Sequence, residues 1–292
     1  MSQPIFFQLF YDNDLPARLL ELTGWEQGAL SVHAFPDGES LIRVDTPVSG
    51  RPVIILANLQ GPDGKYLQLA MLCDYLRQQG ASGIHLLSPY LPYMRQDKAF
   101  NPGEAVSAQL FARRLGTVVD DLTTIDPHLH RIHDLSEVYR IPATTLHADP
   151  LIAQWIRNNL EKPLIIGPDS ESRQWAQAVA EQVGCDHLVL EKIRHGDNDV
   201  EVSAPDAHRF TDHTPVMVDD IISTGHTMIE TAQHLERLKL KAPVCIGVHG
   251  LFSGDAWRAM QNSYIADIVT CDTIPHPTNR ISVAQLLADN SR

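Results

Sequence analysis

The sequence predicts an α/β protein with two mostly parallel sheets, each flanked by helices. Short apolar runs of strand length alternate along the chain with longer segments in which apolar residues recur at helical spacing. This alternation occurs in both halves of the 292-residue chain, which is long enough for two domains with cores of their own. Strands that alternate with helices pair in parallel and are covered on both faces, so ligands are expected at the carboxyl ends of the strands.

Strands are predicted wherever a short apolar run is bounded by polar residues. Such runs occur at Ile5–Phe10, Val53–Ala57, Ile84–Leu87, Leu122–Ile125, Leu164–Ile166, Leu188–Leu190, Val216–Val218 and Val244–Val248. Helices are predicted where apolar residues recur on one helical face. Such segments occur at Lys65–Gln79, Glu171–Val183, Met228–Leu238 and, near the C-terminus, Val283–Ala288.

A domain boundary is expected near residue 146. There a strand-like run leads into a helix that Asp149 and Pro150 begin. The predicted domains are residues 1–146 and residues 147–292. The Pro-rich stretch Asp272–Thr278 is expected to form a rigid loop before the last helix, and the sequence does not decide whether that helix packs on the first domain.

The overall composition narrows the class of partners. With 23 Lys and Arg against 36 Asp and Glu, the formal net charge is −13, which argues against general nucleic-acid binding. No apolar run approaches the roughly 18 residues of a membrane span, and the N-terminus shows no leader pattern. The cysteines lack metal-ligand spacing, so buried free thiols in a reducing, cytoplasmic compartment are expected at Cys73, Cys185, Cys245 and Cys271.

The segment Val216–Thr227 is the most informative part of the sequence. An apolar run ends in two adjacent carboxylates, Asp219 and Asp220, and a turn then leads into a helical pattern. The carboxylates suit sugar hydroxyls or a metal. Backbone N–H groups at a helix start favour a phosphate dianion, Gly225 lets the backbone approach it, and hydroxyls add donors at Ser223, Thr224 and Thr227. The segment resembles the phosphoribosyl-binding loop of the phosphoribosyltransferase fold; the alternative is an acidic strand end before a capped helix.

A second segment suits the phosphates of a nucleotide. Arg95 follows a predicted strand, together with Gln96, Asp97 and Lys98. The guanidinium of Arg95 offers a planar fork for phosphate oxygens, and Lys98 is a second cation. The alternative is a solvated charged loop.

A third segment, Phe35–Glu39, lies between two strand-like runs. An aromatic face beside the carboxylates of Asp37 and Glu39 suits a nucleobase and its exocyclic donors. The alternative is a simple hairpin turn, because Pro-Asp-Gly is strong turn chemistry.

Two strand ends carry candidate metal ligands. Asp126, His128 and His130 follow one predicted strand, and Asp169 follows another. A neutral histidine nitrogen binds metals, and no Cys or HExxH arrangement favours zinc, so a hard cation that arrives with phosphates is expected. Alternatively, the histidines are structural, and Asp169 only supports a helix N-terminus.

Lys192 and Arg194 are candidate catalytic cations. They follow a predicted strand and are expected on a mobile polar loop. Two cations on such a loop can close over phosphates and neutralise charge during phosphoryl transfer. The alternative is a pair of exposed cations on a flexible loop.

In their order along the chain, these segments resemble the ribose-phosphate pyrophosphokinase family over nearly the whole sequence, from Phe35–Glu39 to Thr273–Pro275. The resemblance implies two phosphoribosyltransferase-like domains. It also implies transfer of the pyrophosphoryl group of ATP to the 1-hydroxyl of ribose 5-phosphate, with Mg²⁺ as cofactor and a homo-oligomer as the active form. Other interpretations remain open: a related pentose-phosphate kinase, or a non-catalytic regulatory paralogue that binds nucleotide.

The resemblance also implies roles for individual positions. The ATP-binding residues would be Phe35, Asp37, Gly38, Glu39, Arg95, Gln96 and Asp97, with the first four commonly supplied by a neighbouring subunit. The metal ligands would be His128 and Asp169, and the catalytic cations Lys192 and Arg194. Ribose 5-phosphate would contact Arg194, Asp219, Asp220, Ser223, Thr224, Gly225, His226 and Thr227.

Some positions depart from the commonest bacterial pattern of the family. Ser223 occupies a position where Asp is frequent, and His226 one where Gly or Ala is usual. The stretch Asp97–Glu104 is less basic than usual and looks archaeal. These departures bear on regulation, nucleotide preference and subunit arrangement more than on the reaction.

Overall fold

The computed structural model describes residues 3–129, 131–168, 173–194, 200–203 and 207–291; at 173–175, 191–194 and 200–203 only the backbone is described. These residues form two compact units. The first contains the described residues up to His147 together with Thr273–Pro275 and the C-terminal stretch from Val283. The second contains Ala148–Asp272 and His276–Ser282. The chain thus returns to its first unit near the C-terminus.

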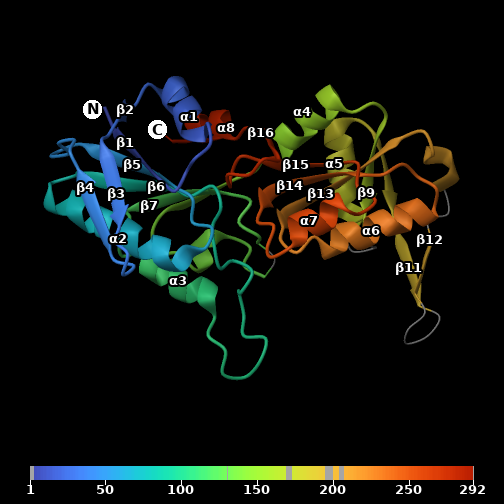
Figure 1. Cartoon of the computed structure of the whole chain (residues 1–292), viewed down its shortest axis with the longest axis horizontal. Coiled ribbons are helices and arrows are strands. Elements are labelled where there is room, and N and C mark those ends of the chain that lie inside the picture. Colours follow the sequence, from blue (N-terminus) through green and yellow to red (C-terminus); the bar gives the residue numbers. More distant parts are fainter. Residues whose placement is uncertain (1–2, 130, 169–172, 195–199, 204–206, 292) are drawn as a thin grey trace. The chain divides into compact units, whose positions relative to one another are not determined.

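The first unit is built on a six-stranded parallel sheet with the strand order β2-β1-β5-β6-β7-β8. Figure 1 shows α1 and α8 on one face of this sheet and α2 and α3 on the other. A separate antiparallel hairpin joins β3 to β4. The elements are β1 (Ile5–Leu9), α1 (Leu15–Thr23), β2 (Glu26–Gln27), β3 (Leu30–Ala34), β4 (Ser40–Val44), β5 (Pro52–Ala57), α2 (Pro62–Gln78), β6 (Gly83–Leu87), α3 (Ser107–Leu115), β7 (Asp121–Ile125), the short 3-10 helix η1 (Leu135–Glu137), β8 (Ala143–Leu146) and α8 (Ala284–Asp289).

The second unit repeats the architecture with the strand order β10-β9-β13-β14-β15-β16. Its helices α4 and α5 lie on one face of the sheet, and α6 and α7 on the other (Figure 1). The hairpin β11–β12 forms a separate two-stranded ribbon. The elements are α4 (Asp149–Asn159), β9 (Pro163–Gly167), α5 (Arg173–Val183), β10 (Asp186–Val189), β11 (Glu191–Arg194), β12 (Val200–Ser203), the 3-10 helix η2 (Ala207–Phe210), β13 (Thr214–Ile222), α6 (His226–Arg237), β14 (Val244–Gly250), α7 (Ala256–Gln261), β15 (Asp267–Cys271) and β16 (Asn279–Ile281).

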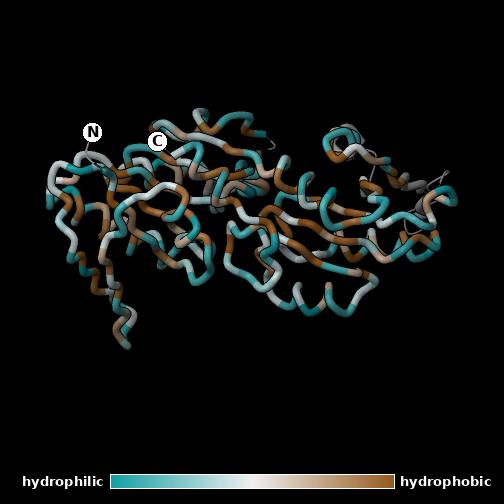
Figure 2. Tube along the Cα trace, turned by 90° about the horizontal axis from the view of Figure 1, so that it is seen from above, coloured by the Kyte–Doolittle hydropathy of each residue, from teal (hydrophilic) through white to brown (hydrophobic). Residues whose placement is uncertain are grey.

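The cores explain why these residues form these elements. In β5 and β14 nearly every residue is buried, as expected for a strand covered on both faces. On α2 the buried residues recur at helical spacing, at Leu69, Leu72, Cys73 and Leu76. In Figure 2 the long hydrophobic stretches run through the interior of each unit, and much of the outer trace is hydrophilic. Among the described residues, no helix is both long and apolar enough to cross a bilayer.

The predicted fold class is confirmed, and so is each predicted strand, with ends that differ by a few residues. Some local predictions are wrong. Lys192 and Arg194 lie on strand β11 rather than in a loop, and β13 runs on to Ile222 instead of ending at Val218. Cys185 is only partly buried, whereas the other cysteines are buried as predicted.

Candidate active site

β9 and β13 are neighbouring parallel strands, and the chain leaves them toward opposite edges of the sheet. From β9 the chain crosses to β10 on one side, and from β13 it crosses to β14 on the other. In open α/β sheets such a switch point leaves a crevice at the carboxyl ends of the strands, where ligands bind. The polar residues that follow β13 therefore lie where a substrate is expected. Asp169, which follows β9 in the sequence, lies outside the described residues.

Asp219 and Asp220 lie within β13, close to its carboxyl end, rather than after the strand as predicted. Asp219 pairs with Gly247 on β14, and both carboxylates are half-buried. A Cβ on Gly247 would approach Cγ1 of Ile222 to 2.7 Å, so a larger residue there would displace the Ile222 side chain. The pair of acids is thus held on a strand, where the positions of side chains are well defined.

The phosphate-type loop is three residues long, Ser223 to Gly225, and leads directly into α6. Gly225 is the N-cap residue with φ 71°, a left-handed conformation that favours glycine. A Cβ there would also meet Sδ of Met260 at 2.7 Å. His226 and Thr227, predicted as loop residues, are the first residues of the helix. Thr224, His226 and Thr227 are exposed, so their polar groups and the helix N-terminus are open to an anion.

A second loop supports this one. Ser253 N donates to the Ser223 carbonyl at 3.0 Å, and the hydroxyls of Ser223 and Ser253 lie 3.3 Å apart. Just before Ser253, Phe252 has φ 44° and donates its N–H to Ile222 O. Its ring packs on His276, with 4.3 Å between centroids. Sequence reasoning missed this support; the signal was His-Gly-Leu-Phe-Ser-Gly, a polar and glycine-rich end to another apolar strand.

In the first unit, the segment with Arg95 and Gln96 begins at a strained residue. Tyr93 has φ 66°, and its hydroxyl donates to the carboxylate of Asp63. This hydrogen bond raises the pKa of Tyr93 to about 12. Gln96 N donates to Tyr93 O at 2.9 Å, and Ser107 Oγ donates to Gln96 Oε1 at 3.2 Å. The segment is therefore fixed at both ends while the Arg95 side chain stays exposed.

Asp97 differs from its neighbours in orientation. Its side chain is only 4% exposed, and Arg131 Nη1 donates to both carboxylate oxygens, at 2.9 and 3.1 Å. The structure thus brings Asp97 together with Arg131, which the sequence did not single out. No local sequence signal links the two residues, because 34 positions separate them.

His128 lies in a tight turn after β7. Asp126 and His128 both have positive φ, 38° and 57°, and His128 N donates to Asp126 O at 2.8 Å. Asp126 Oδ1 lies 2.8 Å from His147 Nδ1, a partner that sequence reasoning missed although His147 directly follows a strand. Such conformations persist only where the surroundings enforce them, and they cluster at functional sites.

The surroundings of His128 bear on whether this residue could hold a metal ion. Within the described ranges, no group of three His, Cys, Asp or Glu side chains is arranged to hold a metal ion. Hard cations such as Mg²⁺ readily take phosphate oxygens and water as ligands, so a cation at His128 would not need a closed set of protein ligands.

The segment Phe35–Glu39 forms the tip of the β3–β4 hairpin. Phe35 N donates to Glu39 O at 2.8 Å, and Gly38, with φ 91°, donates to Phe35 O at 3.0 Å. Residues 31–39 are all exposed, and the Phe35 side chain remains 41% accessible. The hairpin alternative for this segment is thus correct as local structure, and it presents an aromatic ring to solvent.

Lys192 and Arg194 lie on the ribbon of the second unit, which projects from its sheet (Figure 1). They pair in register with Val202 and Val200. Their side chains lie outside the described part of the structure, so their proposed roles rest on sequence alone.

Two family models match the chain. Residues 5–118 match the N-terminal domain of ribose phosphate pyrophosphokinase, and residues 134–285 match the phosphoribosyl transferase domain. The ribose-phosphate pyrophosphokinase of Halobacterium salinarum is 33% identical over 279 residues, which cover 94% of this chain and 96% of that protein. The one from Methanopyrus kandleri is 31% identical and covers 94% of each. Phosphoribosylpyrophosphate synthetase from Mycobacterium smegmatis shares the fold, with a TM-score of 0.84, 23% identity, and coverage of 99% of this chain and 97% of that chain.

Proposed function

The chain belongs to the ribose-phosphate pyrophosphokinase family, and on that premise we propose that it transfers the pyrophosphoryl group of ATP to the 1-hydroxyl of ribose 5-phosphate. The products are phosphoribosyl pyrophosphate and AMP. The observation that carries the proposal is the extent of the match: both family models occur in order, and relatives above 30% identity align over nearly the whole chain. The phosphate-type loop after β13 supplies the matching chemistry.

Residues of the second unit are proposed to bind ribose 5-phosphate, and residues of the first unit to bind ATP. Asp219 and Asp220 accept hydrogen bonds from ribose hydroxyls, and the loop Ser223–Gly225 together with the first turn of α6 binds the 5-phosphate through N–H and hydroxyl donors. Arg95 and Gln96 contact ATP, with Phe35 and its neighbours against the adenine of a site in another subunit.

The 1-hydroxyl oxygen attacks the β-phosphorus of ATP, the bond from that phosphorus to the bridging oxygen breaks so that AMP leaves, and the hydroxyl proton is released to water. Lys192 and Arg194 neutralise charge on the transferring group, which is where a preorganised cation contributes most to the rate. We propose Mg²⁺ as the cofactor: His128 and Asp169 would hold it, and it would supply charge neutralisation during the transfer. The chain itself positions and orients the reactants.

Incubation with ATP, Mg²⁺ and ribose 5-phosphate tests the proposal. We expect equal amounts of AMP and phosphoribosyl pyrophosphate, separated by anion-exchange chromatography and confirmed by ³¹P NMR. ADP as the main nucleotide product would show a simple pentose-phosphate kinase instead. No turnover by folded protein would favour a regulatory paralogue.

We further propose that the active form is a homo-oligomer. The exposed Phe35 at the hairpin tip suits a site on a neighbouring subunit, and α2 carries exposed apolar side chains one helical turn apart. These are Leu67, Met71 and Tyr75, with exposures of 60%, 41% and 38%. The free cysteines and the nucleotide substrate fit an enzyme of the cytoplasm.

A further inference from the structure

We propose that Arg131 is a positioning residue for ATP; this inference rests on the proposed function. Arg131 lies three residues after His128 in the sequence, and it donates to both carboxylate oxygens of Asp97. Asp97 in turn follows Arg95 and Gln96 directly. One ion pair therefore ties the segment proposed to bind ATP to the segment that carries the proposed metal ligand.

The Asp97 carboxylate depends on this ion pair because its side chain is buried. The Asp97 side chain is 4% exposed, whereas Arg131 is 53% exposed. A carboxylate held that far from water requires a charged partner, because an uncompensated buried charge is strongly unfavourable. Because its side chain is turned toward Arg131 and only 4% of it is exposed, Asp97 is inferred to act on the nucleotide by fixing the backbone beside Arg95 rather than through a direct contact.

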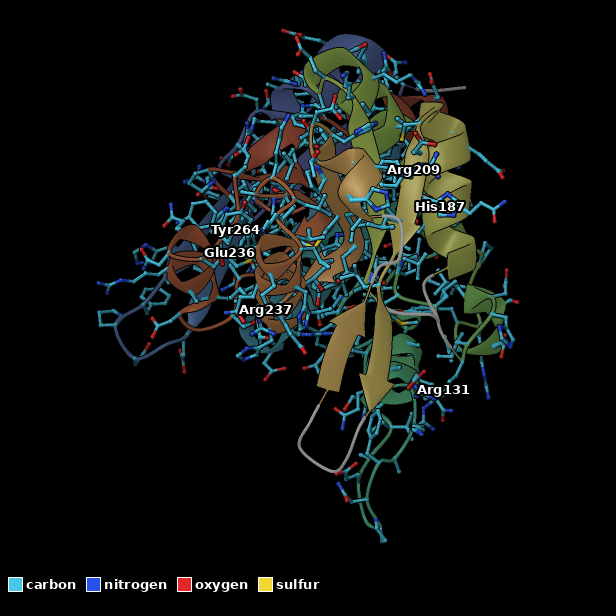
Figure 3. All side chains as sticks on the ribbon, turned by 90° about the vertical axis from the view of Figure 1, so that its right-hand side faces the viewer. Arg131, His187, Arg209, Glu236, Arg237 and Tyr264 are labelled. Carbon is cyan, nitrogen blue, oxygen red and sulfur yellow. The ribbon has the colours of Figure 1, made fainter. Side chains whose placement is uncertain are left out.

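Arg131 is also fixed on its other side. Its guanidinium carbon lies 5.8 Å from the centroid of the Phe100 ring. The same centroid lies 5.2 Å from Lys98 Nζ. The loop that bears Phe100 is closed by Glu104, whose carboxylate accepts from the Phe100 and Asn101 N–H groups at 2.8 and 3.0 Å. Figure 3 shows Arg131 beside this protruding loop, drawn in green.

The segment with Arg95 and Gln96 is thus held from two directions. On one side Gln96 is anchored at the start of α3, by Ser107 Oγ and by Ala108 N, which donates to Gln96 O at 3.2 Å. On the other side Asp97 is anchored by Arg131. Loss of Arg131 removes one of these two anchors. The Arg95 side chain is still present, but it is no longer held in the position proposed to bind phosphate.

The test compares four variants of the full-length protein: Arg131→Met, Arg131→Lys, Asp97→Asn and the double Asp97→Asn/Arg131→Met. Binding of a non-hydrolysable ATP analogue with Mg²⁺, and separately of ribose 5-phosphate, is measured by calorimetry, alongside kcat and both KM values. Arg140→Met is the matched control, because Arg140 is an exposed arginine of the same unit and enters none of the ion pairs among the described residues. Circular dichroism and thermal melting confirm folding.

We expect Arg131→Met to weaken binding of the ATP analogue roughly tenfold, with ribose 5-phosphate affinity unchanged and partial recovery in Arg131→Lys. The double variant should bind the analogue no more weakly than the worse single variant, because the pair acts as one unit. Analogue affinity within twofold of wild type in folded Arg131→Met overturns the inference. So does recovery in the double variant, which would show that an unpaired buried charge, and not lost positioning, caused the defect.

An equal loss of ribose 5-phosphate binding also overturns it, because that would indicate general destabilisation. These binding results decide the inference even if the wild-type protein releases ADP or nothing from ATP, an outcome that would count against the proposed function alone.

Discussion

His147 Nδ1 and Asp126 Oδ1 lie 2.8 Å apart and join the ends of two neighbouring strands, β7 and β8. This hydrogen bond holds the carboxylate of a residue that has positive φ, in the turn that carries His128. Asp126 N also donates to Leu146 O, so the turn is attached to β8 by backbone and side chain together. The position of His128 therefore depends on a residue outside its own turn.

From this bond we predict that His147→Ala raises the Mg²⁺ concentration for half-maximal activity about tenfold, the usual effect of losing a partner that orients a ligand-bearing segment. His147→Asn should recover part of the loss, since its amide can donate to Asp126. Activity is measured against free Mg²⁺ at saturating substrates. His133→Ala, at an exposed histidine of the same unit, serves as the control and should match wild type.

Gly225→Ala should weaken binding of ribose 5-phosphate and destabilise the protein. The left-handed backbone alone disfavours a side chain by about 1–2 kcal/mol, and the new methyl would meet Met260. Gly184→Ala is the matched control, because Gly184 has φ 79° with nothing within 4 Å of its Cβ. Thermal melting and the KM for ribose 5-phosphate separate the two effects: both variants should melt earlier, and only Gly225→Ala should raise KM.

Lys192→Ala should lower kcat by roughly a hundredfold or more while changing either KM much less, because a cation at the transferring group acts mainly in the transition state. Arg194→Ala should act in the same direction, and the double variant should be less than additive if the two cations close as one unit. Asp219→Ala should instead chiefly raise the KM for ribose 5-phosphate. Steady-state kinetics on folded variants measure all of these effects. A near-normal kcat for Lys192→Ala would remove β11 from the mechanism.

Stability should fall as the pH drops below about 6.5, partly because of His276. Burial lowers the pKa of His276 below its ordinary value of 6.5, and Thr278 N donates to its Nδ1, which favours the neutral ring. The unfolded state then binds a proton that the folded state does not, so the free energy of unfolding is largest above 6.5 and decreases as the pH falls toward the folded pKa. Melting temperatures between pH 5 and 8 should show a shallower decline in His276→Gln than in wild type; identical slopes would exclude His276 as a contributor.

Met71→Glu should dissociate the proposed oligomer, because it places a charge in the middle of the exposed apolar row on α2. Light scattering coupled to size exclusion gives the mass in solution. Leu22→Glu, at an isolated exposed leucine of α1, controls for the added charge and should keep the wild-type mass. A wild-type protein that is a fully active monomer would refute the proposal itself.

The sequence by itself determined the features that depend on local order. Helical spacing predicted the buried face of α2, and the apolar run with its acidic end, hydroxyls and glycine predicted the turn from β13 into α6. These signals survive in a single chain because periodicity, turn chemistry and helix capping are properties of neighbouring residues. The order of the motifs was likewise sufficient to indicate the family.

Only the tertiary structure decided which distant residues meet. Asp97 and Arg131 are 34 positions apart, Asp126 and His147 are 21 apart, and α8 packs on α1 from the opposite end of the chain. The end of β13 differs from the prediction for the same reason: this strand continues through its two carboxylates because it stays paired with β14 as far as Ile222 and Gly250. Each of these contacts depends on which strands become neighbours in the sheet, and no local pattern encodes that order.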